Sequence, residues 1–339
     1  MSCRSSTFRS RRSPLALGGL ALTLALTACG GGAEDTASPA GADGVQERDE
    51  SLSFATGGTG GVYFPYGGGI ANVITDKLPG VTVTVQETNA SVDNMLLVQS
   101  GQAALAFGLG DVVSDAAKGE NTFADEGPLN ICALGNLYNN FVHVFSTTSK
   151  GITSVEQMRG KTIAVGAVGS ASEVTANRIL EAAGLDPQKD INRAQLGVAE
   201  TVDALRDGTV DAGFWSGGLP TGAIVDLAST GELVLIDTAQ YADAMAKEYG
   251  DYYFASDIPA GTYDGQDEAS PNVVSPNILV VNKDMDESLQ EDITRVIFEG
   301  KEQLITVHPA ANELDPATAG EIDFIETCPG AQAFFDSAS

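Results

Sequence analysis

The feature that most constrains this chain is a repeated order of strand, glycine-containing turn and helix that begins near Ser51. Alternating β-branched residues at 81–85 predict a strand, and the apolar periodicity of residues 91–100 predicts a helix. The apolar run at residues 103–107 is typical of a strand covered on both faces. Strands that alternate with helices predict an α/β architecture with parallel sheets. Further strands are expected at residues 52–56, 161–165, 210–215, 232–236 and 277–281, and further helices at residues 62–78, 170–183, 199–207, 220–229 and 286–308.

The body from Ser51 to Ser339 is large for one open sheet, and no long low-complexity linker interrupts it. Two lobes joined by crossing strands would accommodate this length. We expect the crossings near residues 138–145 and 252–256, where extended, aromatic-rich segments separate the α/β units. The expected division is a first lobe of residues 51–139 and 256–339 and a second lobe of residues 140–255.

The first 50 residues differ in kind from the rest. Several arginines up to Arg12 precede a short apolar run, which is the layout of a secretory signal peptide and too short to anchor in a bilayer. The run ends at Leu26-Thr27-Ala28-Cys29, which resembles the lipobox of bacterial lipoproteins, in which the cysteine is lipidated. We expect a lipoprotein signal peptide over residues 1–28, a lipid anchor on the cysteine and a flexible tether over residues 29–50. The alternative is an ordinary cleaved signal peptide with a spare cysteine.

The charge of the chain excludes one class of partner. There are 46 Asp and Glu residues against 18 Lys and Arg, which gives a formal net charge of −28 at pH 7. A nucleic-acid-binding protein needs a basic patch or stripe, so nucleic acid is not expected as a partner. Hydrophobic residues make up 43% of the chain, which is enough apolar material for a folded core.

The chain contains few residues or motifs that are typical of catalytic sites. The chain has two histidines, His143 and His308, and neither a His pair at metal-ligand spacing nor a Cys-x-x-Cys or Gly-x-Ser-x-Gly motif. We therefore expect that the protein is not an enzyme and that it binds neither a metal nor a cofactor. We interpret His143 as a hydrogen-bonded strand residue. Cys132 and Cys328 remain beyond the signal peptide and lipobox. They are compatible with one disulfide in an oxidising compartment or with two buried thiols.

Two glycine-rich turns that feed helices could bind an anion. Gly57–Gly61 follows the first strand, and Gly166–Gly169 leads into residues 170–173, which match the Ser-x-x-Glu capping box. Free backbone N–H groups and the positive end of a helix dipole hold a carboxylate or phosphate without a charged side chain. The alternative is a glycine turn with a helix cap. Tyr63 stands where a dinucleotide-binding loop would have its third glycine, which argues against a Rossmann enzyme.

Four motifs in order carry a resemblance to a known family. They are TGGTGGVYFP at residues 56–65, ETNASVDN at 87–94, VGAVGSASE at 165–173 and IPAGTY at 258–263. Together they resemble the TAXI family, the substrate-binding proteins of one class of tripartite ATP-independent periplasmic (TRAP) transporters. Each motif alone is weak, but their order makes the match specific, and the resemblance extends over most of the body.

The resemblance implies a two-lobed, type II periplasmic-binding-protein fold that closes around a small anionic solute, such as glutamate or a related C5 dicarboxylate. The loaded protein would dock on a polytopic TRAP permease driven by an ion gradient. With the lipobox, this implies an exported protein that is lipid-anchored through Cys29 at the outer face of the cytoplasmic membrane. The alternative is a ligand-sensing lipoprotein that presents its ligand to a membrane histidine kinase.

The family's ligand contacts transfer to this chain position by position. The sequence departs from the family at Leu109, where the family commonly has the Gln of a Gln-x-Asp motif, and Asp111 matches its acid. Because Leu109 removes an amide from the implied pocket, the resemblance does not fix the ligand. Arg178 is expected to be a surface or inter-helix partner rather than a ligand contact. The implied contacts are Gly58, Thr59, Gly60, Gly61, Tyr63, Asn89 and Ser91 in the first lobe and Gly169, Ser170, Ser172, Trp215 and Gly217 in the second.

Overall fold

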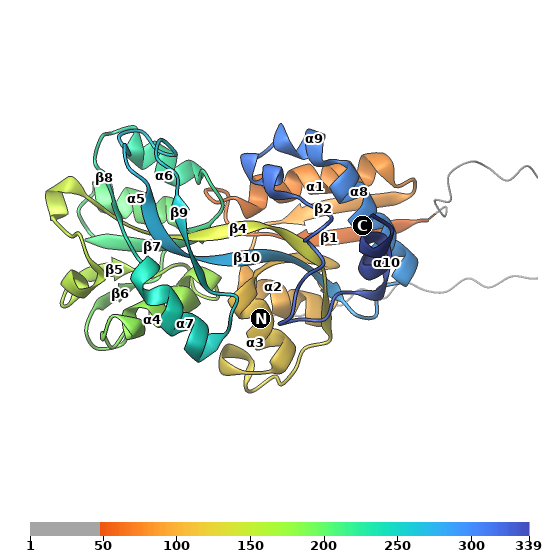
Figure 1. Cartoon of the computed structure of the whole chain (residues 1–339), viewed down its shortest axis with the longest axis horizontal. Helices are drawn as coiled ribbons and strands as arrows, with labels where there is room; N and C mark the ends of the chain where they lie inside the picture. Colours follow the sequence, from red (N-terminus) through yellow and green to blue (C-terminus); the bar gives the residue numbers. More distant parts are fainter. Residues whose placement is uncertain (1–47, 339) are drawn as a thin grey trace, which may run out of the picture. The chain divides into compact units, whose positions relative to one another are not determined.

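A computed structural model of the chain describes residues 48–338. The expected signal peptide, the expected lipid anchor on Cys29 and nearly all of the expected tether therefore lie outside the described residues. Within the described part, the strands form one ten-stranded mixed sheet with helices on both of its faces (Figure 1). Among residues 48–338, no helix combines the length and the apolar character needed to cross a bilayer.

The first half of the sheet is mostly parallel. β1 pairs in parallel with strands on both of its sides, and the fourth strand of this half runs antiparallel to its neighbours. This strand enters the half from the far end of the sequence. The strand order is β2 (Val81–Gln86), β1 (Glu50–Ala55), β3 (Leu105–Leu109), β10 (Ser270–Asn282) and β4 (Ile131–Thr147).

The second half of the sheet is built on the continuation of the same two long strands. β4 pairs with β10 up to Phe141 and from there with β7, while β10 pairs with β9 at its start and with β3 at its end. The remaining strands are β7 (Ala212–Gly217), β5 (Thr162–Ala164), β6 (Asn192–Ala194), β8 (Leu233–Ile236), which pairs with β4, and β9 (Phe254–Ile258), which pairs with β10.

One of the two expected crossings between the halves lies at the residues predicted from the sequence, and the other does not. Residues 138–145 fall inside β4, which crosses between the halves. Residues 252–256 do not cross, because β9 is a short strand that pairs only with β10 in the described part of the chain. The second crossing is β10, and Pro271 and Pro276 inside it obscure its strand pattern. The division into lobes at residues 139, 140, 255 and 256 stays a prediction.

The helices largely follow the expected pattern. One expected helix, residues 286–308, is divided at Gly300, where a Cβ atom would lie 2.8 Å from Cγ1 of Val73. The helices are α1 (Tyr63–Lys77), α2 (Ser91–Gln99), α3 (Gly110–Lys118), α4 (Ala171–Ala182), α5 (Val198–Arg206), α6 (Gly222–Ala228), α7 (Ala242–Tyr249), α8 (Glu287–Glu299), α9 (Lys301–Ile305) and α10 (Pro329–Ala338).

Apolar cores hold the helices on the sheet. In the first half, Phe54 of β1 belongs to one buried cluster with Ile70 of α1 and Ile293 of α8. In the second half, Phe214 of β7 belongs to a separate cluster with Ile179 of α4. These cores fix the strand ends, and the glycine turns after β1 and β5 leave the sheet at the carboxyl ends of parallel strands, where ligands of α/β proteins bind.

A disulfide ties the C-terminal segment to the sheet. Cys132 in β4 is bonded to Cys328, which precedes α10, and their Cα atoms are 5.1 Å apart. The backbone N–H of Cys328 also donates to the carbonyl of Ala133. The bond joins residues 196 positions apart in sequence, so its loss frees a long loop in the unfolded chain.

We expect the double variant Cys132→Ala/Cys328→Ala to lower the free energy of unfolding by about 2–5 kcal/mol, because closing a long loop restricts the unfolded ensemble. Guanidinium unfolding followed by circular dichroism measures this. Reduced wild-type protein is the control and should lose a similar amount. Equal stability of the variant and the oxidised wild type would contradict the expectation.

Candidate functional site

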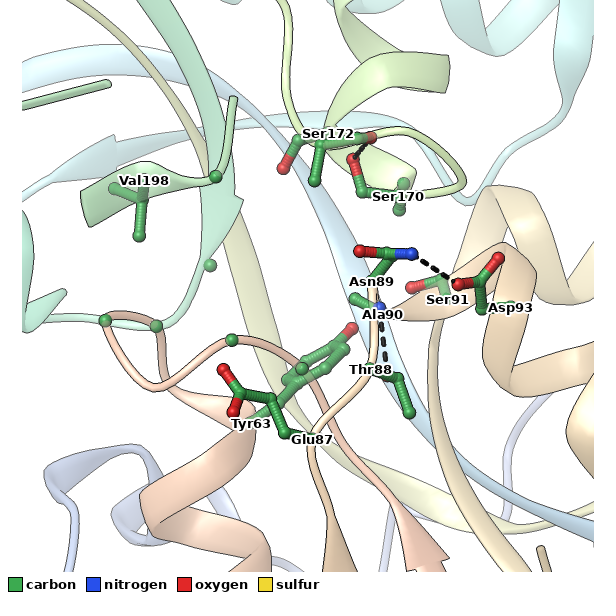
Figure 2. A pocket seen from close by; sticks show the side chains of 18 of the residues that line it. Tyr63, Glu87, Thr88, Asn89, Ala90, Ser91, Asp93, Ser170, Ser172 and Val198 are labelled. Carbon is green, nitrogen blue, oxygen red and sulfur yellow. Dashed lines mark hydrogen bonds between the residues drawn. The ribbon is translucent and has the colours of Figure 1, made fainter. Parts of the chain in front are cut away.

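A cavity of about 830 Å³ lies at the carboxyl ends of the strands and is lined from both halves of the sheet. Every residue that the sequence implied as a ligand contact lines this cavity, except Gly169. Figure 2 shows Ser172 on the opposite side of the cavity from Glu87, with Asn89, Ala90 and Ser91 between them. The volume is within the usual range for small-molecule sites.

The glycine loop between β1 and α1 offers backbone donors to the cavity. The N–H groups of Gly58, Thr59 and Gly60 have no acceptor among residues 48–338. The N–H of Gly61 donates to the carbonyl of Gly58 at 3.2 Å and closes the turn. Gly61 also allows close contact with the other half of the sheet, because a Cβ atom there would lie 2.7 Å from the Trp215 ring.

The start of α4 contributes two serines with different roles. Ser170 is the N-cap: its Oγ accepts from the N–H of Glu173 at 3.2 Å and donates to the carbonyl of Ala167 at 2.7 Å. The expected capping box is only half formed, because Glu173 accepts from Gly169 instead of from Ser170. Ser172 Oγ accepts from the N–H of Ser216 at 2.9 Å. Its O–H has no acceptor within the described residues, so Ser172 is the better ligand donor of the two.

Gly169 occupies a position that the sequence did not indicate. Its carbonyl accepts from the N–H groups of Val92 at 3.1 Å and Asp93 at 3.4 Å, at the N-terminus of α2. Its φ of 75° is in the left-handed region that favours glycine. Gly169 therefore joins the second glycine turn to α2 of the first half, and does not line the cavity.

The start of α5 is part of the site, and the sequence analysis missed it. Gly197, Val198, Ala199 and Glu200 line the cavity, next to the glycine loop. The N-terminus of α5 therefore lines the cavity together with the N-termini of α1, α2 and α4. The available signal in the sequence is Gly197, directly before Val198, which marks a further glycine turn that leads into a helix.

The cavity lining is acidic. Glu87, Asp93 and Glu200 line it, and no Lys, Arg or His does so among the described residues. Asp93 accepts from the side-chain amide of Asn89 at 2.8 Å. A ligand carboxylate in this cavity would therefore depend on backbone N–H and hydroxyl groups at the helix starts. Within the described part of the chain, no group of three or more His, Cys, Asp or Glu side chains could hold a metal ion.

The floor of the cavity combines an aromatic and an aliphatic side chain. Tyr63 lies next to Ser91, and burial raises the pKa of its hydroxyl. Leu109 is fully buried, and its N–H donates to Oγ of Ser91 at 3.2 Å. On the other side, the Trp215 Nε1–H donates to Oγ1 of Thr221 at 3.0 Å, which fixes the ring against the glycine loop.

Arg178 lies outside the cavity lining and is an inter-helix partner. It forms an ion pair with Asp115 of α3 at 2.5 Å and lies 3.6 Å from Asp111. Its guanidinium also lies 4.3 Å from the centre of the Tyr249 ring. The side chain is only 5% exposed, so the surface position considered from the sequence is wrong. Burial raises the pKa of Asp115.

His143 is a structural residue. Its Nδ1 lies 3.0 Å from the carbonyl of Phe141 and its Nε2 lies 2.8 Å from the hydroxyl of Tyr263. Burial lowers its pKa to about 4. Because it is absent from the cavity lining, it has no contact with a ligand there.

Comparison with known proteins gives a family and a fold. Residues 54–337 match the NMT1-like family. A solved structure from Bordetella bronchiseptica RB50 is 17% identical, with a TM-score of 0.53, and the alignment covers 85% of this chain and 98% of that one. The periplasmic aliphatic sulphonate binding protein SsuA from Escherichia coli is 14% identical, with a TM-score of 0.48, over 86% of this chain and 83% of that one. The expected type II periplasmic-binding-protein fold is confirmed.

We expect His143 to make the protein less stable in mild acid. The unfolded chain takes up this proton below about pH 6.5, and the folded chain only near pH 4, so stability falls as the pH drops through that window. The loss is roughly 3 kcal/mol by pH 4. Urea unfolding of the wild type and His143→Gln at several pH values measures it. Parallel pH profiles for the two proteins would rule out this contribution.

Proposed function

We propose that this chain, which belongs to the NMT1-like family and so to the TAXI substrate-binding proteins of TRAP transporters, captures a small carboxylate-bearing solute by closure of its two lobes. Proteins of this family are non-catalytic solute-binding proteins of transporters. The chain therefore binds its solute without converting it.

The observation that carries the proposal is the convergence of helix starts on one cavity. The glycine loop before α1 and the first residues of α4 and α5 all line it. Each helix start contributes backbone N–H groups and a favourable dipole, which together hold a carboxylate without a cation. Thr59 and Ser172 add hydroxyl groups. Such contacts are weaker than a bidentate arginine clamp, which suits a protein that must release its ligand.

Contacts between the halves around the cavity support a closing motion. The carbonyl of Gly169 accepts from the start of α2, and the N–H of Ala223 lies 3.4 Å from the carbonyl of Gly60. The Trp215 ring lies against Gly61. A ligand that contacts both halves would strengthen these few contacts and shift the population toward the closed form.

Delivery to a membrane protein follows from the family. We propose a TRAP-type permease driven by an ion gradient as the partner, and a lipid anchor on Cys29 as the attachment to the membrane. Glutamate and related C5 dicarboxylates are the first solutes to test, because the resemblance implies them. Because the cavity lining is acidic, the preferred ligand among small carboxylates has to be identified by experiment.

We expect a cognate carboxylate at about 100 times its dissociation constant to add roughly 2.7 kcal/mol to the free energy of unfolding. A thermal-shift screen of small carboxylates and amino acids, followed by calorimetric titration of the hits, measures this. Ser172→Ala should weaken binding about 10-fold, because it removes a donor to a charged group. Ser229→Ala is the control, since that hydroxyl bonds to the carbonyl of Asp226 outside the cavity lining.

Two results would overturn the proposal. One is a folded protein that no small carboxylate or amino acid stabilises. The other is a ligand whose affinity is unchanged both in Ser172→Ala and in Gly61→Leu, because the larger side chain at position 61 would occupy the space of the Trp215 ring and hinder closure.

A further inference from the structure

The cavity is not confined to the helix starts, because it also extends along one face of α2. Asp93, Leu96 and Leu97 of α2 line it, and so does Ser100, the C-cap of that helix. Their spacings of three, four and seven residues place all four on one side of the helix. Because an α-helix rises about 1.5 Å per residue, Ser100 lies roughly 13 Å from Ser91 along the axis. We refer to Leu96, Leu97 and Ser100 as the α2 wall.

The two leucines give the α2 wall an apolar surface beside the cavity. Leu96 is 37% exposed. Leu97 is half-buried and packs against the apolar cluster that contains Met95 and Val98. A single exposed leucine on an ordinary surface needs no explanation. Here, however, the exposed leucine lines a binding cavity, where an apolar part of a ligand would remove it from water.

The polar groups of the wall are uncharged and bonded within the protein. Nε2 of Gln102, which also lines the cavity, donates to Oγ of Ser100 at 2.9 Å. The Ser100 hydroxyl in turn donates to the carbonyl of Leu97 at 3.2 Å. The one proton of this hydroxyl is therefore used inside the protein, and the leucine side chains are the main contacts that the wall offers to a ligand.

The charges of the lining favour a ligand with one carboxylate and an uncharged remainder. Glu87, Asp93 and Glu200 line the cavity, and no basic side chain does so among the described residues. Asp93 lies on the same face of α2 as the wall, between the wall and the start of the helix. A second ligand carboxylate there would be repelled by Asp93 with no cation to offset the repulsion. Methylene groups carry no charge and are stabilised by leaving water.

Distance along α2 sets the length of ligand that reaches the wall. Leu96 is five residues beyond Ser91, which corresponds to about 7 Å along the helix axis. An extended carbon chain advances roughly 1.2 Å per bond, so five carbons cover about 5 Å and eight carbons about 8 Å. A carboxylate held at the helix starts beside Ser91 would therefore need about eight carbons for its chain to contact Leu96.

We propose that the α2 wall is a subsite for the apolar chain of the ligand, so that the solute is an unbranched monocarboxylate of about eight carbons. The inference rests on the proposed function and narrows its ligand class, from small carboxylates in general to monocarboxylates with an apolar chain. The helix starts hold the carboxylate, and Leu96 determines the preferred chain length.

A homologous series of acids tests the subsite. The purified full chain, freed of any co-purified ligand, is titrated calorimetrically with butanoate, hexanoate, octanoate, glutarate and 6-aminohexanoate. We expect the affinity to rise about 10-fold for each two carbons added from butanoate to octanoate, which is the gain for removing two methylene groups from water. Glutarate and 6-aminohexanoate, whose chains end in a charge, should bind more weakly than hexanoate.

Leu96→Gln should remove the gain between hexanoate and octanoate and leave butanoate unchanged, because a four-carbon chain ends short of residue 96. A purely structural role of Leu96 would instead weaken all acids alike. Leu96→Met should keep the gain, since methionine is apolar and of similar volume. The matched control is Val225→Gln on α6, because Val225 is 38% exposed and lies outside the cavity lining. It should leave every affinity unchanged.

The outcomes separate the two proposals. Equal affinities across the series, equal weakening of all acids in Leu96→Gln, or tighter binding of 6-aminohexanoate or glutarate than of hexanoate would overturn the apolar subsite, and the solute-binding function would stand. The same holds if the folded wild type binds none of these acids but binds another small carboxylate or an amino acid. If it binds no small carboxylate or amino acid at all, the proposed function is overturned and the subsite with it.

Discussion

Backbone pairing of β4 with β10 sets the position of everything else in the described part of the chain. The two strands pair from Ile131 to Phe141 of β4, and each then continues into the other half of the sheet. The disulfide at Cys132 fastens the C-terminal segment to the same strand. The turns that follow β1 and β2 in the first half and β5 and β6 in the second half line one cavity.

The cavity lining carries acidic side chains and, within the described residues, no basic ones. A chain with a large excess of acids could have placed one of its few basic side chains at the site, but Arg178 is buried among Asp111, Asp115 and the ring of Tyr249. This cluster holds α4 against α3, and the cavity lining of the described residues keeps backbone N–H groups, hydroxyls and side-chain amides such as that of Asn89 as its hydrogen-bond donors, with no basic side chain. Fixed dipoles of this kind bind through geometry, so a small movement of one half relative to the other would weaken several contacts at once.

Local patterns in the sequence were sufficient for the α/β class, for most helices and strands, and for the glycine turns, because periodicity and glycine content act within a few residues. The family resemblance also indicated part of the cavity lining, because every implied contact except Gly169 lines it. Tertiary structure alone decided that β10 is a crossing strand, that Gly169 caps α2, that α5 joins the site and that Arg178 is buried. Each depends on which strands pair and in what register, and that is set by contacts between residues far apart in the sequence.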